Sequence, residues 1–393
     1  MSDTRQYTPA ARVLHWLVAG MIVLQFILAQ LADNASSDLR ELALLANHKS
    51  VGITILAVAI VRIIWRFRNK PPALPAGMPG WQVTASHVSH WSLYVLLFLL
   101  PITGWLMSSA SAYSVSWFNL FQLPDFIGPN PELAETFEEI HELLAKALIA
   151  IAGLHVLAAL KHHFLDKDEV LRRMASAVGW ALFVIVFTLG GALLGGAGKG
   201  PGSSSTSTPA AGNDGATAAA PEIVASILPV WQIDHQASYI KFIGDQAGAE
   251  FEGVWESWSA ELQFAADDLG SSTFSVTIDT ASGNTQDVDR DTTLQDPEWF
   301  DSMNFPEAYF RASDFSASAD GGFVADGQLV IKGAAAPAQF TFTIEADGDS
   351  RVLTGTARLN RLEHGVGTGE WEDTEWIGAD VRVQVRVEAT LPR

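Results

Sequence analysis

The sequence predicts a protein of two domains and two fold classes, an all-α bundle of membrane-spanning helices followed by an all-β antiparallel barrel. Three observations support this prediction. Five long apolar runs lie before residue 195, and short segments of alternating polar and apolar residues follow residue 230. The charge is also divided, because residues 1–178 contain 13 basic and 13 acidic residues. The whole net charge of −20 therefore falls on the second part.

Composition excludes several classes of function. The chain of 393 residues contains no cysteine, which rules out disulfides, iron–sulfur clusters and covalent c-type haem attachment. The chain has a negative net charge and no cluster of Lys and Arg large enough to bind nucleic acid, which argues against that function. A neutral, apolar first part joined to an acidic second part is typical of a membrane domain that carries a soluble domain.

The apolar runs have the length and polarity of membrane-spanning helices. The first could instead be a signal peptide, but it is long for one. Pro101 and Gly104 lie inside the third run, where a membrane helix tolerates them better than a soluble helix does. The five runs are Val13–Ala32, Val51–Trp65, Trp91–Met107, Leu143–Leu160 and Val178–Leu194.

The connections between these runs differ in charge, and the difference predicts an orientation. The connection after the second run and the segment after His163 are basic, whereas residues 108–141 contain five acidic residues and no Lys or Arg. The positive-inside rule then places the N-terminus in the cytoplasm and the end of the fifth helix outside. We expect a membrane domain at residues 1–175, a fifth helix at 176–198, a flexible linker at 199–222 and a periplasmic barrel at 223–393.

Two histidines mark the fourth helix as a candidate functional element. His141 and His155 are 14 residues apart, so at about 100° per residue they share one face, roughly 21 Å apart along the axis. His48 lies at the outer level with His141, and His15 and His90 lie at the inner level with His155. Ionisable groups inside a span are costly and usually functional. Histidines at two matched levels indicate axial ligands for two stacked haems. The alternative is that these histidines only pack against neighbouring helices.

Five motifs in residues 5–175 resemble the bacterial cytochrome b561 family. They are Arg12–Trp16, Asn47–Gly52, His90–Tyr94, Pro101–Trp105 and Leu154–Phe164. The resemblance implies a four-helix bundle in the inner membrane with two b haems that exchange electrons with the quinone pool. It also implies that some members oxidise superoxide on the outer side and reduce ubiquinone.

The resemblance assigns roles to individual residues. It pairs His48 with His141 on the outer haem and His15 with His155 on the inner haem. His90 is expected to hydrogen-bond a propionate or a quinone, or else to ligate the inner haem. Two cations, Arg12 and Lys49, are plausible propionate or anion partners, although both could instead extend their charges to the membrane surface.

The second domain contains seven clear strand segments, and seven or eight strands over about 165 residues indicate a barrel or sandwich. Phe242, Phe251, Phe274, Phe310 and Phe340 could line a cavity. A set of further residues spans residues 228–391: Trp231–Asp234, Ser238–Phe242, Thr285, Arg290-Asp291, Leu294, Phe300-Asp301, Phe305-Pro306, Phe310, Gly327–Gly333, Asn360-Arg361 and Gly365–Gly367. In these residues the segment resembles the YceI family, and the resemblance implies a lipocalin-like barrel that binds isoprenoid chains, including quinones. His364 replaces an aromatic that is commoner in that family, and His235 and His364 are expected to be structural. Arg290 and Asp291 could form a structural ion pair. The segments are Tyr239–Phe242, Ala260–Phe264, Phe274–Ile278, Gln328–Ile331, Gln339–Ile344, Thr354–Leu359 and Val381–Glu388.

These features leave three functions open. The first is electron transfer between quinone or quinol and a periplasmic redox partner through two haems. The second is a superoxide:ubiquinone oxidoreductase. The third is an isoprenoid carrier or sensor whose haems are not catalytic. The sequence does not decide between them, nor whether the protein is an enzyme.

Overall fold

The structure is a computed structural model that describes residues 6–74, 78–194, 226–347 and 350–391. It divides into two compact units, Met1–Lys199 and Gly200–Arg393. The linker expected at residues 199–222 lies outside the described residues.

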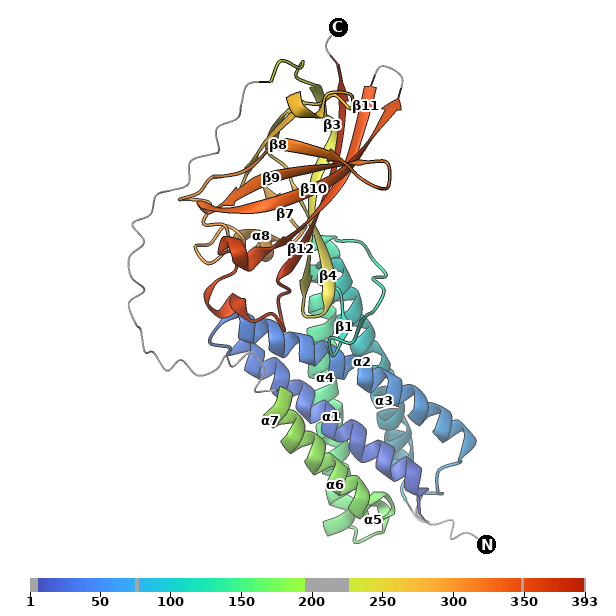
Figure 1. Cartoon of the computed structure of the whole chain (residues 1–393). Coiled ribbons are helices and arrows are strands. Elements are labelled where there is room, and N and C mark those ends of the chain that lie inside the picture. Colours follow the sequence, from blue (N-terminus) through green and yellow to red (C-terminus); the bar gives the residue numbers. More distant parts are fainter. Residues whose placement is uncertain (1–5, 75–77, 195–225, 348–349, 392–393) are drawn as a thin grey trace, which may run out of the picture. The chain divides into compact units, whose positions relative to one another are not determined.

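The first unit is built on four helices that are long and apolar enough to cross a membrane, as the sequence predicts (Figure 1). Each helix extends beyond the apolar run that predicted it, because polar residues form its ends. Thr8, Ser37 and Asn130 cap the first, second and fourth helices by accepting hydrogen bonds from backbone N–H groups. The helices are α1 (Pro9–Asp33), α2 (Asp38–Arg68), α3 (Gly80–Ala110) and α4 (Pro131–Phe164).

A fifth helical run packs against α1. It follows the short helix α5 (Val170–Met174) and consists of α6 (Ala177–Ile185), the π-helical segment η1 (Val186–Gly190) and α7 (Gly191–Leu194). Gly179 allows the close approach, because a Cβ atom there would lie 2.5 Å from the Trp16 ring. The rings of Trp16 and Trp180 stack with centroids 4.2 Å apart. The expected fifth helix is therefore present through residue 194, and its remaining residues lie outside the described residues.

The connection between α3 and α4 is held against α2. It contains the short strands β1 (Ser116–Trp117) and β2 (Phe121–Gln122), which pair with each other. The buried Ser50 hydroxyl donates to the Ser116 carbonyl at 3.1 Å and accepts from the Phe118 N–H at 2.9 Å. Ser50 is two residues after His48, so the α3–α4 connection packs on α2 close to that histidine.

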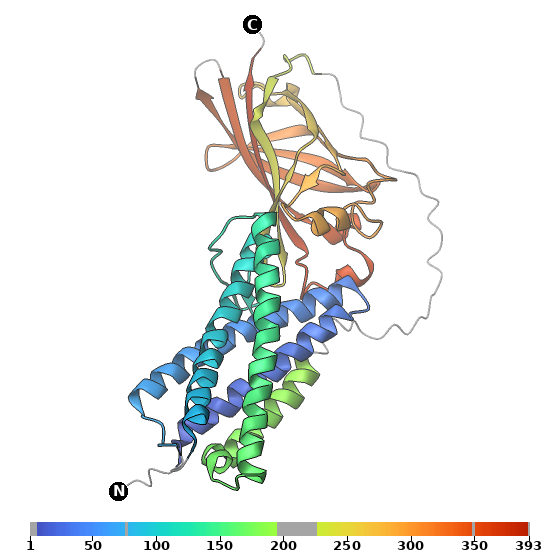
Figure 2. The same cartoon turned by 180° about the vertical axis from the view of Figure 1, so that it is seen from behind.

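The helices pack as two pairs, with α1 along α2 and α3 along α4 (Figure 2). Leu28 and Leu44 are completely buried in the core between α1 and α2. By contrast, only 6% of the apolar window of α4 is buried, and Leu154 and Leu157 are exposed. An apolar helix with so little burial is suited to lipid contact, because lipid tails can solvate its outer face.

The second unit is an antiparallel half-barrel with ten strands, in the order β5-β6-β8-β9-β10-β11-β12-β3-β4-β7 (Figure 1). Short helical turns occupy the connections: η2 (Leu269–Ser271), α8 (Val288–Thr293), η3 (Arg361–His364) and η4 (Gly369–Glu372). The strands are β3 (Gln232–Gln246), β4 (Ala249–Trp255), β5 (Trp258–Gln263), β6 (Thr273–Asp279), β7 (Gly283–Asn284), β8 (Glu307–Ala317), β9 (Phe323–Ile331), β10 (Ala334–Asp347), β11 (Ser350–Asn360) and β12 (Asp380–Thr390).

Six of the seven predicted segments lie within strands, and the seventh, Ala260–Phe264, extends one residue beyond the end of β5. The sheet has ten strands, more than the seven or eight expected, because no predicted segment corresponds to β4, β8 or the two-residue β7. In β8 the pairing with β9 shifts between Ala312 and Asp314, which interrupts the polar and apolar alternation on which the prediction depended. The sheet curls, and the Trp231 N–H donates to the Leu262 carbonyl at 2.8 Å near its β5 end.

Phenylalanine rings lie directly over glycines of neighbouring strands. A Cβ atom at Gly253 would lie 2.2 Å from the Phe242 ring, and one at Gly355 would lie 2.3 Å from the Phe340 ring. Covering a strand glycine with an aromatic ring is a common way to stabilise a strongly curved sheet. A second group of rings closes the core: Phe264, Phe274, Phe315, Phe323 and Phe342.

Candidate functional site

The two histidines expected at the outer level, named the outer pair here, come together from α2 and α4. The ring centroids of His48 and His141 are 6.4 Å apart, with 68° between the ring planes. His48 Nδ1 lies 3.2 Å from the Gln25 carbonyl, and His141 Nδ1 lies 3.2 Å from the Thr103 hydroxyl. A carbonyl can only accept, so the first contact fixes the proton of His48 on Nδ1.

The same tautomer holds for His141. Thr103 donates its own proton to the carbonyls of Leu99 and Leu100, at 2.9 and 3.0 Å, so its oxygen accepts from His141 Nδ1. In both imidazoles Nε2 is therefore unprotonated and keeps a free lone pair, as in a histidine that ligates a metal. Gly104 makes room for it, because a Cβ atom there would lie 3.1 Å from Cε1 of His141.

The inner pair comes together from α1 and α4. The ring centroids of His15 and His155 are also 6.4 Å apart, with 73° between the planes. His90 on α3 is closer to His155, at 5.2 Å between centroids. Arg62 Nη2 lies 3.1 Å from His15 Nδ1 and donates to it, while Arg62 Nε donates to the Tyr94 hydroxyl at 3.2 Å.

These distances can be tested against a haem. Two imidazoles that bind one metal from opposite sides, with bonds of about 2 Å, have ring centres roughly 6 Å apart. The His48–His141 and His15–His155 pairs both match that separation, whereas His90 and His155 are too close for it. Each matching pair also joins different helices, and α4 supplies one member of each.

The two cations singled out in the sequence have protein partners. Arg12 Nη1 donates to the Ala175 carbonyl at 2.9 Å, so it joins α1 to the segment before α6. The Lys49 ammonium lies 5.3 Å from the centre of the Tyr113 ring, in the connection that covers α2. Three partners of the histidines were not predicted from the sequence: the Gln25 carbonyl, Thr103 and Arg62. A signal existed for Thr103, because it lies in the Pro101–Trp105 motif.

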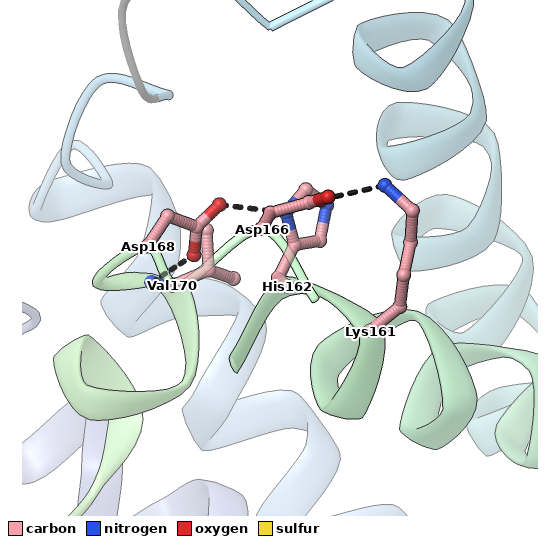
Figure 3. A network of polar contacts seen from close by, with 5 residues as sticks. All are labelled: Lys161, His162, Asp166, Asp168 and Val170. Atoms are coloured by element: carbon pink, nitrogen blue, oxygen red, sulfur yellow. Dashed lines mark hydrogen bonds and ion pairs between the residues drawn. The ribbon is translucent and has the colours of Figure 1, made fainter. Parts of the chain in front are cut away.

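A further polar cluster joins α4 to α5. His162 Nδ1 lies 2.6 Å from Asp168 and 3.1 Å from Asp166, and Lys161 pairs with Asp166 at 2.6 Å (Figure 3). Asp168 also accepts from the Val170 N–H at 2.9 Å. The His and Asp atoms lie within 4.8 Å of one another, as in some metal sites. Because an ammonium and an N–H group already use these carboxylates, we assign the cluster to ordering the turn into α5.

The half-barrel contains a cavity of about 210 Å³ lined mainly by apolar side chains. All five phenylalanines expected to line it do so. Among the singled-out polar residues, His364 lines the cavity and is 3% exposed, while His235 is exposed and packs its ring 4.7 Å from Trp258. Asp291 accepts two hydrogen bonds from Thr285, each of 2.7 Å.

Arg290 lies in the same connection as Asp291, and it stacks its guanidinium 4.5 Å from the centre of the Phe251 ring. The 279–300 connection is thus held by a carboxylate cap on Thr285 and by a cation on an aromatic ring. The ion pair between Arg290 and Asp291 remains a prediction.

Comparison with known proteins covers both units. Residues 6–177 match the prokaryotic cytochrome b561 model, and residues 231–389 match the YceI-like domain model. Cytochrome b561 homolog 2 of Escherichia coli is 33% identical over 176 residues, which cover 43% of this chain and 90% of that protein. The probable superoxide oxidase CybB of Yersinia pestis is 35% identical over 162 residues, covering 41% and 90%.

Among solved structures, BcnA of Burkholderia cenocepacia is 26% identical with a TM-score of 0.39, covering 40% of this chain and all of that chain. The relatives of the first unit and its four apolar helices identify a membrane protein, and its family implies a b-type haem. The chain therefore belongs to the prokaryotic cytochrome b561 family, and it carries a YceI-like domain after the membrane unit.

Proposed function

We propose that this protein is an inner-membrane cytochrome with two b haems that transfers electrons between the quinone pool and a redox partner. The observation that carries this proposal is the equal separation of two histidine pairs, 6.4 Å in each case. His48 and His141 would hold one haem, and His15 and His155 would hold the other. Haem would supply one-electron chemistry when bound at these histidines.

The residues around the outer pair hold its two imidazoles in the form that ligation requires. The Gln25 carbonyl and the Thr103 hydroxyl keep the outer Nδ1 atoms protonated, so that Nε2 stays available. The inner level differs, because the Arg62 guanidinium donates to His15 Nδ1 and leaves the proton of the neutral ring on Nε2, so His15 would have to give up that contact or that proton to hold a haem. A cation beside one ligand favours the reduced, less positive state of that site over the oxidised state. The two levels would thus differ in potential, which suits directed transfer.

His90, Arg12 and Lys49 are assigned supporting roles. His90 lies too near His155 to share a metal with it, so we place it as a hydrogen-bond partner for a propionate or a quinone. Arg12 is at the inner end of α1 and Lys49 directly follows His48, which suits them to anionic groups at the two levels.

The orientation follows from the charges of the connections. The α3–α4 connection contains no Lys or Arg, whereas the α4–α6 segment contains Lys167, Arg172 and Arg173, so the N-terminus would be cytoplasmic and the half-barrel periplasmic. We further propose that the half-barrel binds an isoprenoid chain, because its cavity is lined mainly by aromatic and aliphatic side chains. Each buried CH₂ group adds about 0.8 kcal/mol, so a long chain binds tightly without many polar contacts.

The experiment is a reduced-minus-oxidised spectrum of the purified protein with haem quantitation. Two b haems per chain are expected, and dithionite-reduced protein should be re-oxidised by added quinone. A haem content of one per chain would refute the pairing. Reduced haems that quinone does not re-oxidise would instead favour a carrier or sensor.

A second candidate is a superoxide:ubiquinone oxidoreductase. The 35% identical Yersinia pestis relative named a probable superoxide oxidase favours it, and Lys49 beside the outer pair could attract the superoxide anion. Consumption of superoxide with stoichiometric reduction of ubiquinone would establish this activity. Quinone-dependent re-oxidation without superoxide consumption would leave electron transfer to another partner.

A further inference from the structure

The half-barrel cavity contains few polar side chains, and most of them are committed to the protein. Arg361 directs its five N–H groups to backbone carbonyls at 2.6 to 3.0 Å. Thr280 donates to the Phe305 carbonyl at 2.7 Å, and Gln339 donates to Asp326 at 2.9 Å. These groups are therefore engaged in holding loops and strands.

Two further polar groups line the cavity: Asp245 accepts from the Gly248 N–H at 3.2 Å, and the Trp299 indole N–H is fully enclosed and has no partner in the described chain. His364 differs from both, because it is almost completely buried and one of its ring nitrogens is neither bonded nor enclosed. It lies at the end of η3, lines the cavity and is 3% exposed. Its Nδ1 faces the Ala334 carbonyl at 3.5 Å, and its Nε2 has no hydrogen-bond partner among the described residues. Several side-chain nitrogen and oxygen atoms of the described chain are fully enclosed and lack a partner, and Nε2 of His364 is not one of them. Nε2 is therefore accessible, although the residue as a whole is almost completely buried. The cavity is the open space that this residue lines.

The chemistry of this nitrogen follows from its neighbours. Because a carbonyl only accepts, the contact with Ala334 places the ring proton on Nδ1 and leaves a lone pair on Nε2. Burial lowers the pKa of His364, opposed by the Ala334 carbonyl and by Glu363, so the neutral ring prevails at pH 7. A neutral imidazole with a free Nε2 accepts a hydrogen bond. A ligand atom that donates one would satisfy it.

We propose that His364 Nε2 receives the hydroxyl group of an isoprenoid lipid, either an alcohol or a hydroquinone, whose chain fills the apolar cavity. The inference rests on the proposed isoprenoid binding and adds the class of head group. A carbonyl or ether at the same place offers no proton, so the oxidised quinone or a methyl ether of the same chain leaves Nε2 unsatisfied. The cavity thereby distinguishes hydroxyl-headed chains from their oxidised or capped forms.

The test compares matched ligands on the full chain in detergent. Tritiated geranylgeraniol and its methyl ether have the same chain and differ in the donor. One hydrogen bond predicts that the alcohol binds about threefold to tenfold more tightly. A second arm compares a short-chain ubiquinol with its ubiquinone. Preference in the alcohol arm, the quinol arm or both identifies the head group that His364 receives, and preference in neither overturns the proposal.

Three variants complete the design. His364→Phe should bind the ether as before and lose the preference for the alcohol, whereas His364→Gln retains an acceptor and should keep it. Ala357 lines the cavity, so Ala357→Trp should fill it. Any lipid that this variant still binds is then bound by the membrane unit. A preference that survives in His364→Phe refutes the role of His364. Wild-type binding no greater than that of Ala357→Trp refutes isoprenoid binding itself, which separates the two failures.

Discussion

The hydroxyl of Thr103 on α3 accepts a hydrogen bond from Nδ1 of His141 on α4, across 3.2 Å. Thr103 passes its own proton to the backbone of α3, so its oxygen is fixed as an acceptor. A residue that never touches the proposed iron thus determines which nitrogen of the ligand is free. This kind of partner raises the basicity of a metal-bound imidazole.

Thr103→Val should keep the outer haem and raise its midpoint potential. The loss of the hydrogen bond makes His141 a weaker donor to the oxidised iron. A hydrogen bond of about 1 kcal/mol corresponds to roughly 40 mV for one electron. A redox titration of the two haems measures the shift. Thr103→Ser keeps the hydroxyl and serves as the control, and an equal shift in both variants would contradict the assignment.

His48→Ala and His141→Ala should each reduce the haem content from two per chain to one. Each removes an axial ligand from the same pair, so the surviving spectrum should be identical in both variants. Haem-to-protein ratios and low-temperature spectra measure this. Two variants that lose spectrally different haems would show that His48 and His141 do not share a metal.

His155→Ala should remove the inner haem, whereas His90→Ala should retain it with a shifted potential. The reason is geometric, because His155 and His15 stand 6.4 Å apart while His90 stands 5.2 Å from His155. Haem content and redox titration of the two variants decide the matter. The opposite pattern, with haem lost only in the His90 variant, would make His90 the ligand.

The half-barrel should be accessible from the periplasmic side. The acidic α3–α4 connection and the basic residues near α5 predict this orientation. Protease added to intact spheroplasts should release a soluble fragment of the size of the half-barrel, detected by an antibody to the C-terminus. Cleavage only in inverted vesicles would reverse the topology.

Asp245→Asn should stabilise the half-barrel at pH 7 and not at pH 3. Burial raises the pKa of Asp245, opposed by the Gly248 N–H and reinforced by Glu250. Below its ordinary pKa of about 3.9 the carboxyl is protonated in both folded and unfolded chains, so no penalty arises. As the pH rises through the elevated folded pKa, an ionised group remains half-buried and stability is lost.

The asparagine escapes that penalty and can still accept from the Gly248 N–H, now 3.2 Å from Asp245 Oδ1. Because Asp245 is half-exposed, solvent screening limits the gain to at most about 1 kcal/mol. Calorimetry at several pH values measures it. Asp320→Asn, at an exposed carboxylate, controls for the loss of one charge. A gain of equal size at pH 3 would rule out this cause.

The four long helices could be predicted from the sequence, because a membrane-spanning helix must have a certain length and an apolar composition, and both are visible in a short stretch of sequence. The 14-residue interval between His141 and His155 predicted a shared face, and their rings meet His48 and His15 in the structure. The acceptors on Nδ1 could not be predicted in the same way. The Gln25 carbonyl is a backbone atom of another helix, and any residue type could have supplied it.

The strands were predicted where alternation was regular and missed where it was broken. The register shift between Ala312 and Asp314 puts the buried side chains before and after it out of phase, so a period of two does not run through β8. The role of His364 was hidden for another reason. Whether a lone histidine is structural or faces a cavity depends on the tautomer and on the packing of η3, which no local pattern encodes.

The glycines beneath the phenylalanine rings determine how much the half-barrel can hold. Phe242 and Phe340 line the cavity, and the ends of their rings lie against Gly253 and Gly355. A methyl group at either glycine would force the ring toward the interior and take up space that is now open. The open volume of the cavity therefore depends in part on two residues that do not line it. A substitution at Gly253 or Gly355 would change the space available to a bound chain without replacing any side chain that lines the cavity.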